Sequence, residues 1–140
     1  MFVPKGSKPF SKSIVDEPIF KSIYKNWGKT GDIAFIAMEN KSDNLIGIAW
    51  VRLYADVNLS LGIIDKSIPA LSIAVKKKYR NNGIGTSLLD ELIIAVKNQG
   101  FTGISLSVDN RNFALKLYEK FGFKLHQESS EFNPLYLLQF

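Results

Sequence analysis

The sequence predicts a single-domain α/β protein, with a mixed sheet flanked by helices. Two observations predict it. The apolar runs 33–38 and 45–54 lie on either side of the turn-forming segment 40–44, which indicates an antiparallel hairpin. From residue 70 onward, strand and helix patterns alternate in the order β-α-β-α-β, which places helices on the faces of a sheet.

Composition limits the possible classes of protein. The 140 residues contain 46% hydrophobic residues, which suits one core and a single domain over 1–140. There is no cysteine and one histidine, so disulfides and thiol nucleophiles are excluded and no metal site is expected. No apolar stretch of about 18 residues and no signal-peptide pattern is present, so a cytoplasmic protein without membrane contact is expected.

The first half of the chain predicts a helix and then the hairpin. Residues 1–13 predict a loose lead-in. Acidic residues and Pro18 mark a helix start, and Gly28 marks its end. Its apolar positions repeat at helical spacing: Phe20, Ile23, Tyr24 and Trp27. Segment 55–69 has no clear period and predicts a loop with space for one helical turn.

The second half supplies the alternating pattern. A strand is predicted over 70–75, and a helix whose buried side contains Leu88, Leu89, Leu92, Ile93 and Val96 ends before Gly100. Alternation at Ile104, Leu106 and Val108 predicts another strand. Asp109 or Asn110 is the expected cap of the next helix, which ends at Gly122. Segments 123–125 and 135–140 predict two closing strands.

The loop between the 70–75 strand and the next helix carries the strongest chemical signal. It is basic at 76–80 and contains Gly83 and Gly85. Free backbone N–H groups and the positive end of a helix dipole meet there, which favours a phosphate-bearing ligand. A side chain at either glycine would keep a phosphate away from the backbone. Leu88 stands where a dinucleotide fingerprint needs a third glycine, and no P-loop Gly-Lys-Ser/Thr is present.

The loop instead has the form Arg-x-x-Gly-x-Gly, in Arg80, Gly83 and Gly85. Segment 112–123, Asn-Phe-Ala-Leu-Lys-Leu-Tyr-Glu-Lys-Phe-Gly-Phe, follows after a helix and a strand. Together these motifs resemble those of the GCN5-related N-acetyltransferase (GNAT) family, with the likeness strongest over 69–123. The resemblance implies a GNAT-like fold and an enzyme that moves an acetyl group from acetyl-coenzyme A to a primary amine.

The resemblance also implies which residues bind the coenzyme. Main-chain groups of the loop and the helix start hold the pyrophosphate, and the backbone of the 70–75 strand pairs with the pantetheine arm like an added strand. The residues implied are Ile73, Ala74, Val75, Arg80, Asn81, Asn82, Gly83, Ile84, Gly85, Thr86, Ser87 and Asn112. Lys76 to Lys78 are expected to steer the anion rather than to hold it.

Two of the matched residues also have an ordinary structural explanation. Asn112 is either a coenzyme contact or a first-turn helix residue. Tyr118 is either core packing or, as the family implies, the acid that protonates the departing thiolate. Arg52 and Trp50 share a strand face, so Arg52 could reach a substrate carboxylate, but a surface position is the favoured interpretation. Trp27 and Trp50 are expected to pack, and His126 to be solvated.

The sequence does not specify the general base of the implied reaction or its amine acceptor. Ala70 stands where many family members place a Glu, and Asp65 is the nearest upstream acid. Deprotonation could use water held by Ser72 or the backbone, or the acceptor could enter already neutral. The acceptor could be a small molecule, a peptide or a protein lysine, and the protein a monomer or homodimer.

Two alternatives to catalysis remain. One is a non-catalytic sensor or partner subunit that binds acyl-coenzyme A, which Ala70 and the short lead-in favour mildly. The other is nucleic-acid binding by 76–80, which no recognition motif supports. The family's usual first strand is expected to be absent or rudimentary here.

Overall fold

The computed structural model describes residues 5–8 and 11–140. Its helical elements are η1 (Lys12–Asp16), α1 (Pro18–Tyr24), η2 (Leu59–Leu61), η3 (Lys77–Tyr79), α2 (Ile84–Asn98) and α3 (Leu115–Lys120), where η denotes a 3₁₀ helix. Its strands are β1 (Ile33–Met38), β2 (Leu45–Arg52), β3 (Ala70–Val75), β4 (Gly103–Ser107), β5 (Lys124–Gln127) and β6 (Leu135–Gln139). None of the described helices is long and apolar enough to cross a membrane.

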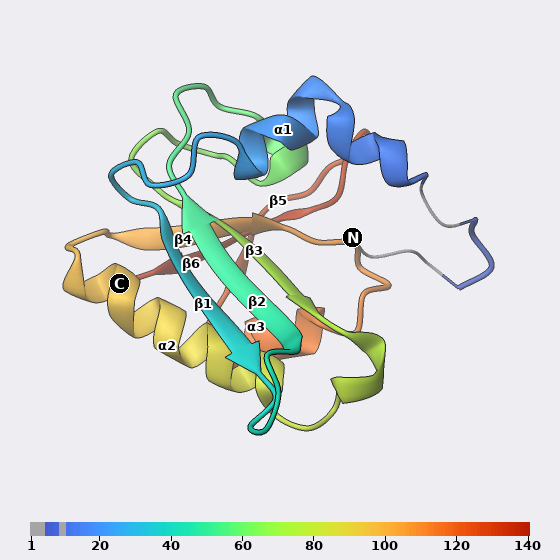
Figure 1. The fold of residues 1–140 in the computed structure, drawn as a ribbon. Coiled ribbons are helices and arrows are strands. Elements are labelled where there is room, and N and C mark those ends of the chain that lie inside the picture. The colour runs from blue at the N-terminus through green and yellow to red at the C-terminus, as the bar shows by residue number, and fades with distance from the viewer. Residues whose placement is uncertain (1–4, 9–10) are drawn as a thin grey trace.

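The strands form one mixed six-stranded sheet in the order β1-β2-β3-β4-β6-β5 (Figure 1). The predicted hairpin is confirmed, because β1 and β2 pair antiparallel. The β3–β4 pair is parallel, and every other neighbouring pair is antiparallel. The α2 crossover accounts for this, since parallel neighbours need a connection that returns the chain to the same end of the sheet. The predicted mixed α/β class is confirmed.

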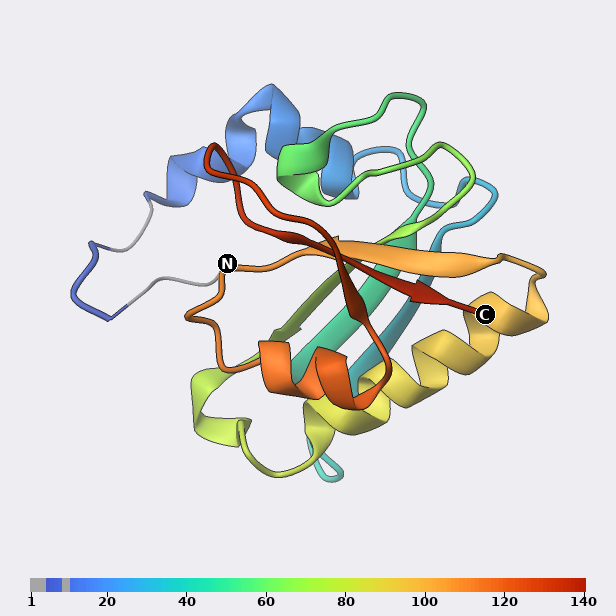
Figure 2. The ribbon, with the colours of Figure 1, turned by 180° about the vertical axis from the view of Figure 1, so that it is seen from behind.

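One face of the sheet carries the hydrophobic core. Figure 2 shows α2 and α3 in front of this face. The predicted stripe of α2 is fully confirmed: Leu88, Leu89, Leu92, Ile93 and Val96 are all buried. Opposed pairs such as Ala49–Ile73 and Val51–Leu71 pack on the same side. The α2 stripe therefore fixes β3 and the start of α2 relative to each other, which positions the loop between them.

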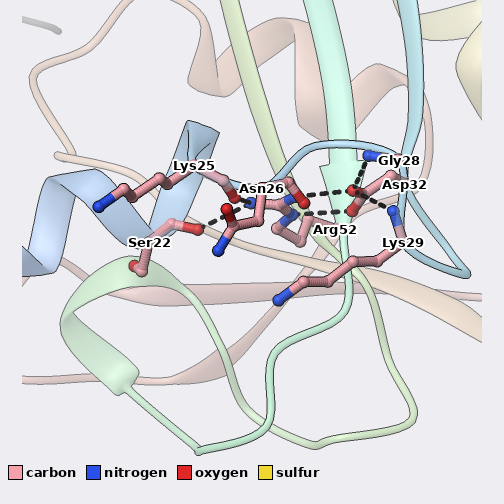
Figure 3. Close-up of polar contacts among 7 residues, drawn as sticks. All are labelled: Ser22, Lys25, Asn26, Gly28, Lys29, Asp32 and Arg52. Carbon is pink, nitrogen blue, oxygen red and sulfur yellow. Dashed lines mark hydrogen bonds and ion pairs between the residues drawn. The ribbon is translucent and has the colours of Figure 1, made fainter.

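The opposite face is held to the N-terminal segment by Arg52, at the end of β2 (Figure 3). Its guanidinium donates Nε to Asp32 Oδ1 at 2.8 Å and Nη2 to Asp32 Oδ2 at 2.7 Å. It also donates to the carbonyls of Ser22, Lys25 and Asn26, at and just after the end of α1. All five N–H donors are thereby used. The side chains are only 3% and 1% exposed, so this is a buried ion pair.

These contacts correct three predictions. Arg52 is buried, so its predicted surface position and substrate contact are wrong. α1 ends at Tyr24, and Trp27 lies beyond it, 47% exposed and over the guanidinium at 5.2 Å. The predicted helix through Trp27 is therefore wrong, because Arg52 takes carbonyls that a continuing helix would have used and Asn26 adopts a positive φ of 54°.

Other boundaries differ by small amounts. β2 ends at Arg52 rather than 54, β4 covers 103–107, and β5 covers 124–127. The predicted helical turn in 55–69 is present as η2. The predicted cap of α3 at Asp109 or Asn110 is wrong, because the helix begins at Leu115 and its N-cap is Ala114, which has no side-chain cap. Residues 1–4 and 9–10 of the predicted lead-in lie outside the described residues, and its last part belongs to η1. No strand precedes β1 among the residues the structure describes.

The Arg52–Asp32 pair generates a stability prediction. We expect Asp32→Asn to lower the free energy of unfolding by about 3–5 kcal/mol, because it leaves a buried guanidinium without its counter-ion. Arg52 holds the pKa of Asp32 below its ordinary value of 3.8. The stabilisation is therefore complete above pH 3.8 and is lost as the pH falls through the lowered pKa. Denaturant titrations between pH 2 and 7 measure both effects.

The matched control is Asp43→Asn, which removes an exposed carboxylate from the β1–β2 turn. It should change stability by no more than about 0.5 kcal/mol. An equally small effect of Asp32→Asn would show that the pair does not hold the N-terminal segment in place.

Candidate active site

The site is built around an opening between β3 and β4. The two strands share a single pair, Ala70 with Ser105, where Ser105 N–H donates to the Pro69 carbonyl at 3.1 Å. Beyond that pair β3 runs away from β4 (Figure 1). β3 remains paired with β2 along its whole length. The family-implied opening beside this strand is thus present.

The opening exposes backbone groups of β3. The Lys76 N–H donates to the Ile46 carbonyl on β2 at 2.9 Å. Because alternate residues of an antiparallel pair point their polar groups toward the partner, the groups of Ile73 and Val75 face the opening instead. Ala74 is an exception among the predicted contacts, since its backbone faces β2. The Val75 carbonyl accepts a hydrogen bond from Arg80 Nε. Unpaired groups inside a sheet are costly, so an extended ligand that pairs with the backbone of Ile73 and with the Val75 N–H fits this edge.

The loop after β3 is shaped by two left-handed residues. Asn81 has a φ of 61° and Gly83 a φ of 79°. Asn82 Nδ2 donates to the carbonyls of Tyr79 and Arg80 at 3.3 and 3.0 Å, which holds the loop closed on itself. The first helical bond of α2 runs from Ser87 N–H to the Gly83 carbonyl at 3.0 Å.

The start of α2 therefore presents free donors. The N–H groups of Ile84, Gly85 and Thr86 precede the first intrahelical bond, and Gly83 supplies no side-chain cap. A Cβ at Gly83 would meet nothing within 4 Å, so this side of the loop is open to a ligand. Free donors and the helix dipole favour an anion at this loop, which is compatible with the predicted pyrophosphate site.

Gly85 faces the space between β3 and α3. A Cβ there would lie 3.6 Å from Leu117 Cδ2 and 3.9 Å from Val75 Cγ2. Because glycine has no side chain, the space between β3 and α3 stays open at this position. A methyl group would make ordinary contacts, whereas a larger side chain would fill the space at the outer end of the opening.

Arg80 joins the two motifs. Its Nε donates to the Val75 carbonyl at 2.9 Å, and its guanidinium lies 5.5 Å from the ring centre of Phe113. Phe113 is 57% exposed, which is unusual for so large an apolar side chain next to a candidate site. The sequence analysis missed Phe113, although an aromatic residue directly after Asn112 was a usable signal.

The basic run before the loop is exposed to solvent. Lys76, Lys77 and Lys78 are all exposed. Tyr79, between this run and Arg80, donates its hydroxyl to Glu39 Oε1 on the β1–β2 turn at 3.2 Å. Glu39 is a second residue that sequence reasoning missed, and no local signal pointed to it. Its contact ties the hairpin to the loop.

Asn112 has a structural role just before α3, which is one of the two alternatives that the sequence left open. Its Oδ1 accepts from Ala114, which starts α3, and its N–H donates to the Asp109 carbonyl at 2.8 Å. Asp109 in turn forms an ion pair with Arg111 at 2.6 Å. That ion pair and the Arg111 N–H lower the pKa of Asp109 to about 2. These contacts fix the turn between β4 and α3 without any ligand.

Tyr118 lies in α3 and is 7% exposed. Its ring packs edge-to-face on Phe123 at 5.8 Å. Burial raises the pKa of the Tyr118 hydroxyl to about 12. Among the described residues no group hydrogen-bonds the hydroxyl, so it is neutral at physiological pH and remains available as a donor. Both core packing and a protonating role are compatible with this position.

No group of three or more His, Cys, Asp or Glu side chains that could hold a metal ion occurs within the described part of the chain.

A mixed sheet that parts beside a loop with free helix N-terminal donors is suited to an extended, phosphate-bearing ligand. The model of the Acetyltransferase (GNAT) domain family matches residues 30–125, and the chain belongs to this family. The protein is therefore an N-acetyltransferase of the GNAT type, and the family uses acetyl-coenzyme A.

Solved structures agree with the family model. A GNAT-family acetyltransferase from Staphylococcus aureus Mu50 is 26% identical with a TM-score of 0.67, covering 89% of this chain and 77% of that one. A GNAT-family acetyltransferase from Streptococcus pneumoniae is 28% identical with a TM-score of 0.60, covering 76% and 65%. A putative streptothricin acetyltransferase from Bacillus anthracis, solved with acetyl-coenzyme A, is 24% identical with a TM-score of 0.64, covering 90% and 71%. No curated protein matches the sequence.

The geometry at Gly85 generates a binding prediction. We expect Gly85→Val to weaken acetyl-coenzyme A binding at least about tenfold, because its methyl groups fill the space against Leu117 and Val75 where the ligand enters the opening. Gly85→Ala is the matched control and should bind close to wild type. Calorimetric titration of folded protein measures both. Equal affinity of Gly85→Val and wild type would refute the assignment of this space to the ligand.

Burial of Tyr118 generates a second prediction. The neutral hydroxyl is favoured in the folded protein, so the folded state loses stability as the pH rises from 10, the ordinary tyrosine value, to about 12. Two pKa units correspond to about 3 kcal/mol. We expect Tyr118→Phe to lack this component of alkaline destabilisation. Denaturant midpoints of both proteins between pH 8 and 12 test it, and parallel curves would contradict it.

Proposed function

We propose that this chain transfers acetyl from acetyl-coenzyme A to a primary amine by direct attack on the thioester. The observation that supports it most is the opening beside β3, because the backbone of Ile73 and the N–H of Val75 face it without a strand partner, and α2 begins beside it with the free N–H groups of Ile84, Gly85 and Thr86. One extended ligand with a pyrophosphate at one end satisfies both sets of groups.

In this proposal the predicted residues have distinct tasks. The loop 80–83 and the start of α2, through Ser87, hold the pyrophosphate with main-chain donors. Arg80 supplies positive charge, and Phe113 holds its guanidinium in place. The backbone of Ile73 and the N–H of Val75 pair with the pantetheine arm. Ala74 and Asn112 line the site but make no backbone or Oδ1 hydrogen bond to the ligand, because those groups already have partners within the protein.

The protein's contribution to rate is mainly the placing of two reactants together. Such placement is worth up to roughly 7–11 kcal/mol of the barrier. The amine nitrogen attacks the thioester carbon, the carbon–sulfur bond breaks, and the departing thiolate needs a proton. A Tyr118 hydroxyl with a pKa of about 12 is always protonated in the working range, so it can donate that proton and recover it from solvent.

A non-catalytic protein that only holds acyl-coenzyme A is the second candidate, favoured by the lack of an acidic side chain anywhere in β3. Release of free thiol in the presence of mixed amines separates the two. Ligand binding without thiol release from any amine would support the binding protein.

Tyr118 provides the mechanistic test. We expect Tyr118→Phe to bind acetyl-coenzyme A as wild type does but to transfer acetyl about 10²-fold more slowly, the usual effect of losing an acid–base group. Stopped-flow thiol release and calorimetric titration on the same preparation measure rate and affinity. An unchanged rate in folded Tyr118→Phe would leave this residue with core packing alone.

A further inference from the structure

Three serines lie on the face of the sheet opposite α2, at the opening between β3 and β4. Arg52 pairs with Ala70, Trp50 pairs with Ser72, and Ala70 pairs with Ser105. Directly paired residues share a face, and so do residues two apart on a strand. Ser72, Ser105 and Ser107 are therefore on one face, away from the core.

Their place relative to the opening follows from the register. Ala70 with Ser105 is the last pair before the strands part. Ser72 and Ser107 are each two residues beyond it, so they stand on the two sides of the opening. Ser105 is at its closed end, fully buried between β3 and β6.

The Ser107 hydroxyl is buried and has no hydrogen-bond partner in the described part of the chain, and the same holds for Ser105. Buried hydroxyls are nearly always paired in native proteins, so an orphan beside a ligand-binding opening indicates a polar group supplied from outside. Gly62 lies against the backbone of Leu106 and Ser107, where a Cβ would come within 2.5 Å of the Ser107 nitrogen. The η2 turn thus shields this side from water.

On the same face, at the closed end of the opening, Arg52 pairs with Ala70 and forms a buried ion pair with Asp32. Arg52 lowers the pKa of Asp32, so this carboxylate does not take up a proton near neutral pH. β3, β4 and η2 contain no titratable side chain, and Tyr136 of β6 lies on the core side. The nearest acids along the chain are Asp65 and Asp109. Hydrogen bonds from Ser67 lower the pKa of Asp65, and Arg111 lowers that of Asp109 to about 2. Neither carboxylate takes up a proton near neutral pH.

We propose that Ser72 and Ser107 form the polar part of an acceptor subsite that receives weakly basic amines in their neutral form, such as the α-amino group of a peptide, in preference to lysine side chains. This inference rests on the proposed function and adds the class of acceptor. Ser107 is a positioning residue that binds the amine nitrogen.

The step balances without a protein base. The neutral amine forms the carbon–nitrogen bond as the carbon–sulfur bond breaks. The thiolate takes a proton from Tyr118, and the new amide nitrogen releases its extra proton to solvent, from which Tyr118 is reprotonated. Without a carboxylate to hold an ammonium ion or remove its proton, only the neutral fraction of the acceptor reacts.

The neutral fraction of the amine differs between α-amino groups and lysine side chains. An α-amino group has a pKa near 8 and a lysine side chain one near 10.4, so at pH 7.5 the neutral fractions differ about 200-fold. This ratio, rather than any contact with the rest of the acceptor, sets the expected preference.

The first experiment compares two short peptides of otherwise equal sequence, one with a free α-amine and no lysine, the other Nα-acetylated with one lysine. Measured by thiol release at pH 7.5, kcat/KM should be about 100-fold higher for the peptide with the free α-amine. For each peptide, kcat/KM should rise with pH toward the pKa of its own amine. The inference would be overturned, without affecting the proposed function, by a kcat/KM for the lysine peptide that equals or exceeds that for the free α-amine. A pH profile of kcat/KM that rises near neutral pH for both peptides would overturn it in the same way. No release from either peptide, with acetyl-coenzyme A still raising Tm, would instead overturn the proposed function on which it rests.

The second experiment uses a matched pair of variants. Ser107→Ala should raise the acceptor KM about tenfold, the effect of one neutral hydrogen bond, with the Kd for acetyl-coenzyme A unchanged. Ser105→Ala alters the same residue type on the same strand and face but lies beyond the acceptor's reach, so its acceptor KM should stay at the wild-type value. Neither variant should lose Tm, because neither hydroxyl has a bond to lose. An unchanged KM in Ser107→Ala, or an equal rise in both variants, would refute the role of Ser107.

Discussion

The single shared pair between β3 and β4 is the constraint on which the rest of the molecule depends. Parallel neighbours normally continue their hydrogen bonds along the sheet, and here they stop after Ala70 and Ser105. The strands can part only because each has another partner, β2 for β3 and β6 for β4. The opening therefore removes most of the hydrogen bonds between β3 and β4, but each strand is still held by its other neighbour. A rigid gap lined by Ile73 and Val75 is suited to hold a ligand without rearrangement.

Two fixed supports keep this gap in position. On the core face, α2 packs its apolar stripe against the sheet and carries the loop that begins beside β3. On the other face, Arg52 uses all five of its donors to hold the end of α1 and Asp32. A buried guanidinium whose donors are all satisfied fixes geometry rather than binding substrate.

Sequence reasoning found the parts of the fold that periodicity encodes. The α2 stripe, the hairpin and the order of strands all have local patterns, and all are confirmed. The end of α1 could not be found in this way, because Trp27 continues the helical spacing while Arg52, 25 or more residues away, takes the carbonyls of Lys25 and Asn26. The anion loop was predictable from its composition. Ser107 and Glu39 were not, since burial without a partner and a contact across 40 residues exist only in three dimensions.

The proton path gives the site its chemical character. In the proposed mechanism, Tyr118 is held neutral by burial and gives the departing thiolate a proton donor throughout the working range. The proposed acceptor side offers serine hydroxyls, and the described residues of β3 and β4 contain no group that can take a proton near neutral pH. A site arranged in this way can assist departure of the thiolate but cannot activate an ammonium ion. Its selectivity for the amine must then arise from the amine's own basicity, which connects the absence of a carboxylate in β3 and β4 to the choice of acceptor.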